Sequence, residues 1–173
     1  MNTNELGHVR GQQSGFTLIE LVVVIVIIAI LAATVLPRFA ELSEEAHEAS
    51  VRGTAGAFGS AVALVKAQWT GVGAPGEVND GLEGFGADNV NTNAEGWPVS
   101  VTDGASSSNC VNLWRALLQS NAPTVSASDG DDTDYVASSG TNSCTYEYQR
   151  GDTEHTIEYN AEEGEVSTSL NNS

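Results

Sequence analysis

A single acidic side chain, Glu20, interrupts an apolar segment that otherwise carries no charge. The segment runs from Phe16 to Leu36 and directly follows Gly15. A helix of this length spans about 31 Å, enough to cross a bilayer core of about 30 Å. Inserting an unpaired carboxylate into a membrane is costly, so acids at such positions usually have a function. We therefore expect a membrane helix in which Glu20 works together with a cation.

A new chain terminus is the best available source of that cation. No Lys or Arg lies between Phe16 and Leu36. Cleavage between Gly15 and Phe16 would give Phe16 an α-amino group with a pKa of about 8, which is mostly protonated at neutral pH. In a medium of low dielectric constant, its attraction to the Glu20 carboxylate can offset the burial penalty. Proteolysis would then act as a switch for assembly.

These residues resemble the processing site of type IV pilins and of the related pseudopilins of type II secretion. The matching stretch is Gly15-Phe16-Thr17-Leu18-Ile19-Glu20 with the apolar run after it. The resemblance implies that Gly15 is the cleavage residue and Phe16 the N-methylated terminus. It also implies that Glu20 pairs with the terminal amine of a neighbouring subunit. A looser likeness to pilins of the mannose-sensitive haemagglutinin type extends through Phe58.

Other interpretations of this segment remain open. An ordinary secretory signal has a shorter apolar core, and Ala29–Thr34 offers only a poor cleavage site for one. A plain membrane anchor has no reason to place an acid in its first turn. Glu20 could also bind the amine of its own Phe16, since residues i and i+4 are neighbours on a helix.

The leader, residues 1–15, departs from the family pattern. It holds one acid, Glu5, and one basic residue, Arg10, whereas these leaders are usually short and basic. We expect translation to start at Val9 rather than Met1, which leaves Arg10 as the only charge. The mature chain would be the same in both cases.

Length and charge limit the function classes. A chain of 173 residues suits one long helix and one modest head. Its net charge of -17 would repel phosphate backbones, which argues against nucleic-acid binding. The excess of acids also suggests a marine or salt-loving source.

The helix is expected to continue to Thr70. Pro37 should bend or loosen it, after which an amphipathic pattern resumes. A first apolar stripe comprises Phe39, Leu42, Ala46 and Ala49, with Glu41, Glu44, Glu45 and Glu48 facing elsewhere. A second comprises Val51, Ala55, Phe58, Val62, Val65 and Trp69. Gly71, Gly73, Pro75 and Gly76 end the helix, and Gly53, Gly56 and Gly59 suggest close packing against one of its faces.

Residues 71–173 are expected to form a small head. Glu77–Gly96 is predicted as a long surface connection, Trp97–Val101 as a short extended piece and Val111–Gln119 as a short helix. Three late segments alternate apolar and polar residues and predict an antiparallel meander: Cys144, Tyr146, Tyr148; His155, Ile157, Tyr159; and Val166, Thr168, Leu170. Turns at Arg150–Asp152 and Ala161–Gly164 would join them. The fold class is α+β, with a long N-terminal helix packed on a small antiparallel sheet.

Cys110 and Cys144 are the only cysteines, and in an exported head they would most simply form one disulfide. A metal site is a poor alternative, because two thiols without a nearby His pair lack a tetrahedral ligand set. The pairing also resembles the disulfide-bounded region of many type IV pilins, here residues 110–144.

Other candidate sites are weaker. Asp129, Asp131, Asp132 and Asp134 could hold Ca²⁺, but the loop lacks the glycine and distal glutamate of an EF-hand, so a solvated acidic loop is favoured. Arg150-Gly151-Asp152 spells an adhesion tripeptide, yet ordinary turn chemistry explains it better. His8, His47 and His155 are scattered and support no catalytic triad. We expect no enzyme activity, no cofactor and no metal.

The sequence thus predicts a filament subunit made as a precursor. The precursor would cross the inner membrane once, with its leader in the cytoplasm, and end in a surface pilus for adhesion or motility. The resemblance implies several partners: identical subunits in a helical filament, a prepilin peptidase and methyltransferase, an assembly platform, and a separate motor ATPase. Two alternatives remain, a pseudopilin of a type II secretion system and a membrane-anchored binding module that never polymerises.

Overall fold

A computed structural model describes residues 15–73, 76–101, 109–128, 130, 132–151 and 153–171. The chain divides into two compact units, Met1–Glu41 and Leu42–Ser173. The leader up to residue 14, with Glu5, Val9 and Arg10, lies outside the described residues.

One long helix, α1, comprises Leu18–Gly71. The helix that was expected to resume after Pro37 in fact continues through it. Its N-terminal part is long and apolar enough to cross a membrane, judged by length and composition. The side chains of this part are exposed in the isolated chain. Two glycines with positive φ, Gly73 and Gly76, follow the end of α1, as is usual where a helix terminates.

The two predicted stripes of α1 have different outcomes. The second stripe is confirmed: Val51, Phe58 and Val65 are fully buried, and Trp69 is partly buried against the same core. The residues of the first stripe, Phe39, Leu42, Ala46 and Ala49, lie on the helix as predicted and are exposed in the isolated chain. The polar side chains of Glu44, His47 and Glu48 are the partly buried ones in that region.

The three glycines of α1 were expected to allow close packing. A Cβ atom at Gly59 would lie 3.8 Å from Val166. Gly53 and Gly56 have no neighbour within 4 Å of such an atom among the described residues, so the expectation is wrong for them within a single subunit.

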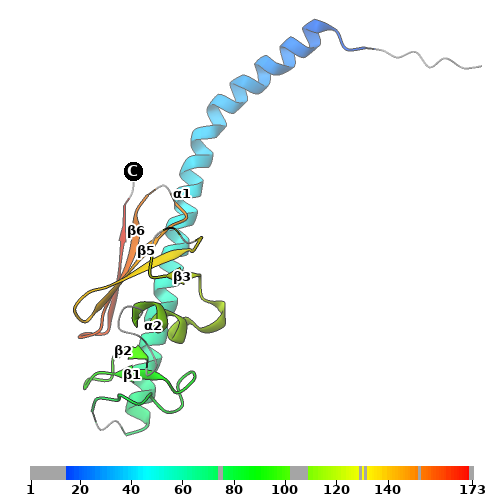
Figure 1. The fold of residues 1–173 in the computed structure, drawn as a ribbon. Coiled ribbons are helices and arrows are strands. Elements are labelled where there is room, and N and C mark those ends of the chain that lie inside the picture. The colour runs from blue at the N-terminus through cyan, green and yellow to red at the C-terminus, as the bar shows by residue number, and fades with distance from the viewer. Residues whose placement is uncertain are drawn as a thin grey trace, which may run out of the picture. The chain divides into compact units, whose positions relative to one another are not determined.

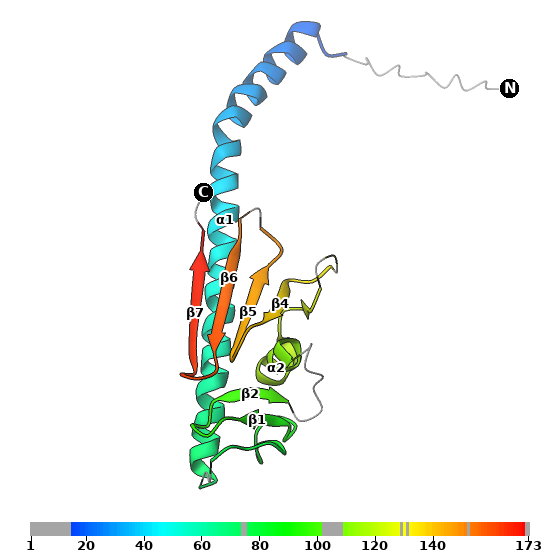
Figure 2. The same cartoon turned by 60° about the vertical axis from the view of Figure 1, so that its left-hand side comes forward.

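The larger sheet has five strands in the order β3-β4-β5-β6-β7. They are β3 (Val125–Ser126), β4 (Tyr135–Ser139), β5 (Ser143–Tyr148), β6 (His155–Asn160) and β7 (Glu165–Leu170). β3 and β4 are parallel, and the other neighbours are antiparallel. The predicted meander is therefore confirmed as β5 to β7, while β3 and β4 were not anticipated. In Figures 1 and 2 the sheet runs beside the part of α1 that carries the second stripe.

A two-stranded antiparallel sheet, β1 (Val90–Thr92) and β2 (Pro98–Val101), follows the long helix. β2 agrees with the predicted extended piece. The prediction that residues 77–96 are a surface connection is wrong, because Leu82 and Val90 are buried and Val78 forms a bridge with Thr92. The few apolar residues of this Gly- and Asn-rich segment, such as Leu82 and Val90, are therefore part of the core.

Helix α2 (Asn109–Leu118) and the short 3₁₀ helix η2 (Gln119–Asn121) complete the head. The predicted short helix is confirmed as α2, in which Leu113, Trp114 and Leu117 are buried. Phe58 of α1 contacts the rings of Trp114, Tyr146 and Tyr159, with centroids 5.7, 5.4 and 5.5 Å away. This aromatic cluster joins the long helix, α2 and the sheet in one core.

Candidate processing and assembly site

Thr17 and Glu20 cap the N-terminus of α1 reciprocally. The Thr17 backbone N–H donates to Glu20 Oε2 at 2.8 Å, and the Thr17 hydroxyl donates to the same oxygen at 2.7 Å. The Glu20 backbone N–H lies 3.3 Å from Thr17 Oγ1. This is a capping box, in which Ser or Thr precedes Glu by three residues, and it starts the helix at Leu18.

The capping box is a role for Glu20 that the sequence analysis missed. Its signal was present as Thr17-x-x-Glu20 directly before an apolar run. In the described part of the chain, Glu20 has no cationic partner, and its carboxylate is held by Thr17 alone. The box holds the carboxylate on the backbone nitrogen of Thr17, the residue that follows Phe16.

Gly15 and Phe16 precede the helix and have no regular secondary structure. Phe16 is 93% exposed, and a Cβ atom at Gly15 would meet nothing within 4 Å. Among the described residues, nothing therefore shields the peptide bond between them from a protease. The cleavage, methylation and pairing roles of Gly15, Phe16 and Glu20 remain predictions.

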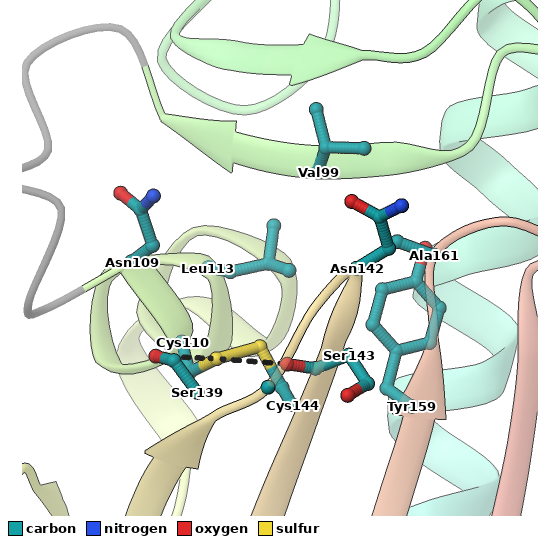
Figure 3. Close-up of a pocket in the computed structure, with 11 residues that line it drawn as sticks. Val99, Asn109, Cys110, Leu113, Ser139, Asn142, Ser143, Cys144, Tyr159 and Ala161 are labelled. Atoms are coloured by element: carbon teal, nitrogen blue, oxygen red, sulfur yellow. Dashed lines mark hydrogen bonds between the residues drawn. A yellow bond between two sulfur atoms is a disulfide. The ribbon is translucent and has the colours of Figure 1, made fainter.

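The structure joins Cys110 of α2 to Cys144 of β5 in a disulfide, with Cα atoms 5.6 Å apart. Both residues are buried. Figure 3 shows the bond beside a small pocket between α2, β2 and the turn from β4 to β5. The pairing that the sequence suggested is thus present, and it links the helix of the head to the centre of the sheet.

The acidic loop before β4 is tied to an arginine. Arg150 Nε donates to Asp134 Oδ1 at 2.9 Å, and its Nη1 pairs with Asp132. Burial alone would raise the pKa of the Asp134 carboxyl, but hydrogen bonds from Thr124 and Arg150 outweigh it and hold that pKa below its ordinary value. Two of the candidate Ca²⁺ ligands are therefore engaged with Arg150; Asp129 and Asp131 lie outside the described residues.

The same contacts bear on the Arg150-Gly151-Asp152 tripeptide. Arg150 forms ion pairs with Asp132 and Asp134, and Gly151 lies close to the His47 ring of α1. Asp152 lies outside the described residues.

His47 and His155, which are far apart in the sequence, both lie near Tyr148, with ring centroids 5.6 and 6.4 Å away.

Comparison with known proteins identifies the N-terminal region. Residues 10–36 match the family described as the prokaryotic N-terminal methylation motif. The chain carries a prokaryotic N-terminal methylation motif. The matched segment contains Gly15, Phe16, the capping box and the apolar part of α1.

One curated relative extends the likeness. It is the type IV narrow pilus major component PilA5 of Thermus thermophilus, 38% identical over 58 residues. The alignment covers 34% of this chain and 50% of the relative, so the chain spans about half the length of the curated pilin it matches. No solved structure matches the chain significantly. The α+β architecture, with a long N-terminal helix on antiparallel sheets, is nevertheless pilin-like.

Proposed function

We propose that the chain is the precursor of a structural subunit of a type IV pilus. The observation that carries this proposal is the order of features at the N-terminus. An exposed Gly15–Phe16 bond precedes a capped helix, and the helix opens with an apolar segment that carries one acid. A catalytic role is not needed to explain any of these features.

Cleavage after Gly15 would change the electrostatics of this site. It converts the neutral Phe16 amide into an amine that is charged at neutral pH. The carboxylate of Glu20 accepts a hydrogen bond from the next backbone nitrogen, that of Thr17. In lipid or in a filament core, where the dielectric constant is low, the amine of an adjacent subunit can compete for this carboxylate and fix the register between neighbours. Methylation of the Phe16 nitrogen by the processing enzyme would leave its charge in place.

The apolar part of α1 would serve two environments in turn. In the precursor it crosses the inner membrane once, with the leader in the cytoplasm. After processing it packs against the same helices of sister subunits, so its apolar surface stays out of water in both states. A separate motor ATPase and an assembly platform would supply the work of extraction.

The likeness to a pilus component agrees with a subunit of a surface pilus. The PilA5 relative is named as the major component of a narrow pilus. By analogy, the acidic head of this chain would face the outside of the cell, where the filament acts in adhesion or surface motility. A pseudopilin of type II secretion shares the same N-terminus and is the alternative that the experiment must separate.

The proposal is tested by processing and by filament formation. Mass spectrometry of the purified protein should show a chain that begins at Phe16 with one added methyl group. Replacing Glu20→Ala should abolish surface filaments, whereas Glu41→Ala, an exposed acid of the same helix beyond the apolar run, should leave them intact. An uncut N-terminus, or normal filaments from the Glu20→Ala strain, contradicts the proposal. Stalled release of secreted enzymes without loss of filaments would assign the chain to a secretion system instead.

A further inference from the structure

His155 of β6 is completely buried, and its hydrogen-bond partners come from two separate parts of the chain. Its Nε2 lies 2.9 Å from Oε1 of Glu44 on α1 and 3.1 Å from Oγ1 of Thr153. The Thr153 hydroxyl also donates to the Glu44 carboxylate. Glu44 thus accepts two hydrogen bonds from the segment that leads into β6.

The partners determine where the protons lie. Thr153 has a single hydroxyl hydrogen, which goes to Glu44, so its oxygen can only accept from His155. His155 must therefore carry its proton on Nε2. The other ring nitrogen, Nδ1, is buried and has no hydrogen-bond partner among the described residues. Both donors reach Oε1 of Glu44, and these hydrogen bonds are strongest while that carboxyl is ionised.

Polar contacts extend this cluster along the turn between β5 and β6. Nδ1 of His47, one helical turn after Glu44, lies 3.0 Å from the hydroxyl of Tyr148. A Cβ atom at Gly151 would lie 3.6 Å from the His47 ring. From Val51 onward, by contrast, α1 contacts the sheet through apolar side chains. The turn is therefore held on α1 by hydrogen bonds, while the rest of the sheet is held by the core.

Other titratable groups lie near Glu44 on the elements that pack around it. Apart from Glu44, α1 contributes His47, β5 contributes Tyr148, and β6 contributes His155. β7 places Leu170 opposite His155. The hydrogen bond from Thr153, helped by the two histidines, holds the pKa of the Glu44 carboxyl below its ordinary value, although partial burial acts in the opposite direction.

We propose that Glu44, Thr153 and His155 form an acid-sensitive latch that holds the β5–β6 turn on α1. The contribution of this latch is complete while the Glu44 carboxyl is ionised, and it is lost as the pH falls below about 4.5, the ordinary titration range of a glutamate. A protonated Glu44 no longer offers a charged acceptor to Thr153 and His155. The turn then opens, while the core beneath Val51–Val65 stays packed.

Hydrogen exchange of the processed, full-length subunit in detergent tests the latch. Exchange is measured by mass spectrometry at several pH values between 7 and 3, with rates corrected for the intrinsic pH dependence of exchange. In the wild type, protection of residues 149–155 should fall about tenfold or more across the acid range, as expected for the loss of charge-assisted hydrogen bonds. Protection of the helix around Val51–Val65 should change little.

Two variants and one control make the result decisive. Glu44→Gln should lower protection of the turn about tenfold at pH 7 and remove most of its pH dependence. Thr153→Val removes the largest cause of the lowered pKa, so its protection should be lower at pH 7 and should fall less across the acid range than in the wild type. Glu45→Gln, an exposed neighbour on the same turn of helix, should follow the wild type. An unchanged acid profile in Glu44→Gln, or an acid-dependent loss in Thr153→Val as large as in the wild type, overturns the proposal.

Discussion

The indole ring of Trp97 lies directly against the backbone of Gly164. Gly164 ends the turn between β6 and β7 and has a φ of +70°. A Cβ atom built on it would lie 2.3 to 2.7 Å from three carbons of the Trp97 ring. The contact joins the two sheets of the head at a position where only glycine fits both the conformation and the space.

Replacing Gly164→Ala should therefore destabilise the head on two counts. The left-handed backbone conformation costs about 1 kcal/mol, and the clash with Trp97 adds about 1 to 3 kcal/mol. Gly73→Ala is the matched control, since Gly73 has a φ of +81° but no described residue within 4 Å of an added Cβ atom, and it should show the first cost alone. Denaturant unfolding of both variants provides the comparison; equal losses would mean that the Trp97 contact is unimportant.

The disulfide should contribute a large part of the stability of the head. It closes a loop with a sequence separation of 34 residues, which corresponds to about 3.8 kcal/mol in the chain-entropy model. The double variant Cys110→Ser, Cys144→Ser should lose roughly this free energy of unfolding. Reducing the wild type with a thiol should give a similar loss. A loss below about 1 kcal/mol in both experiments would contradict the expected role.

Lys66 should stabilise the contact between the end of α1 and the β1–β2 hairpin. Its Nζ lies 4.4 Å from the ring centroid of Trp69 and 5.0 Å from that of Trp97, and it donates to the Glu95 carbonyl. Lys66→Met keeps the aliphatic stem but loses the cation, so we expect a loss of about 1 to 2 kcal/mol in unfolding free energy.

The control for Lys66 is another cation of the same helix. Arg52 is 63% exposed and pairs with Glu48 one turn away. Arg52→Met should change the unfolding free energy by less than about 0.5 kcal/mol. If the two variants lose the same amount, the position of Lys66 over the two indoles has no special value.

The buried tyrosines should make the head sensitive to alkali. Burial raises the pKa of Tyr135 to about 12 and raises the pKa values of Tyr146 and Tyr159 further. In an unfolded chain these tyrosines ionise at about pH 10. Because their pKa values are higher in the folded state, the folded state is favoured below that pH and loses stability above it. Absorbance of tyrosinate should rise together with loss of helical circular dichroism. Ionisation of these three tyrosines without unfolding would contradict this.

The parts of the fold that were predictable have clear periodic patterns. The second stripe of α1 and the alternation in β5, β6 and β7 each place large apolar residues on one face, and these faces form the core. The first stripe is exposed in the isolated chain, whereas Glu44 and His47 beside it are partly buried and make hydrogen-bonding contacts with His155 and Tyr148. The spacing of apolar residues predicts which face of a helix is buried by apolar contacts. It does not predict a face that is buried by hydrogen bonds, such as that of Glu44 and His47.

The candidate site shows the same limit. The apolar run and its acid are evident in the sequence, whereas the short pattern Thr17-x-x-Glu20 also gives Glu20 a role as a helix cap, which the structure shows. β4 was missed because Tyr135 and Ala137 are its only buried side chains, next to an Asp-rich loop. The proximity of His47 and His155 depends on how the sheet packs on α1, which no local pattern encodes.

The position of Lys66 has a practical consequence for anyone who wishes to attach dyes or cargo to this protein. It is the only lysine in the sequence, and its nitrogen is stacked on two aromatic rings and bonded to a carbonyl oxygen. Reagents that acylate primary amines will therefore find few targets on the head. Coupling through the many surface carboxylates is the route that its chemistry favours.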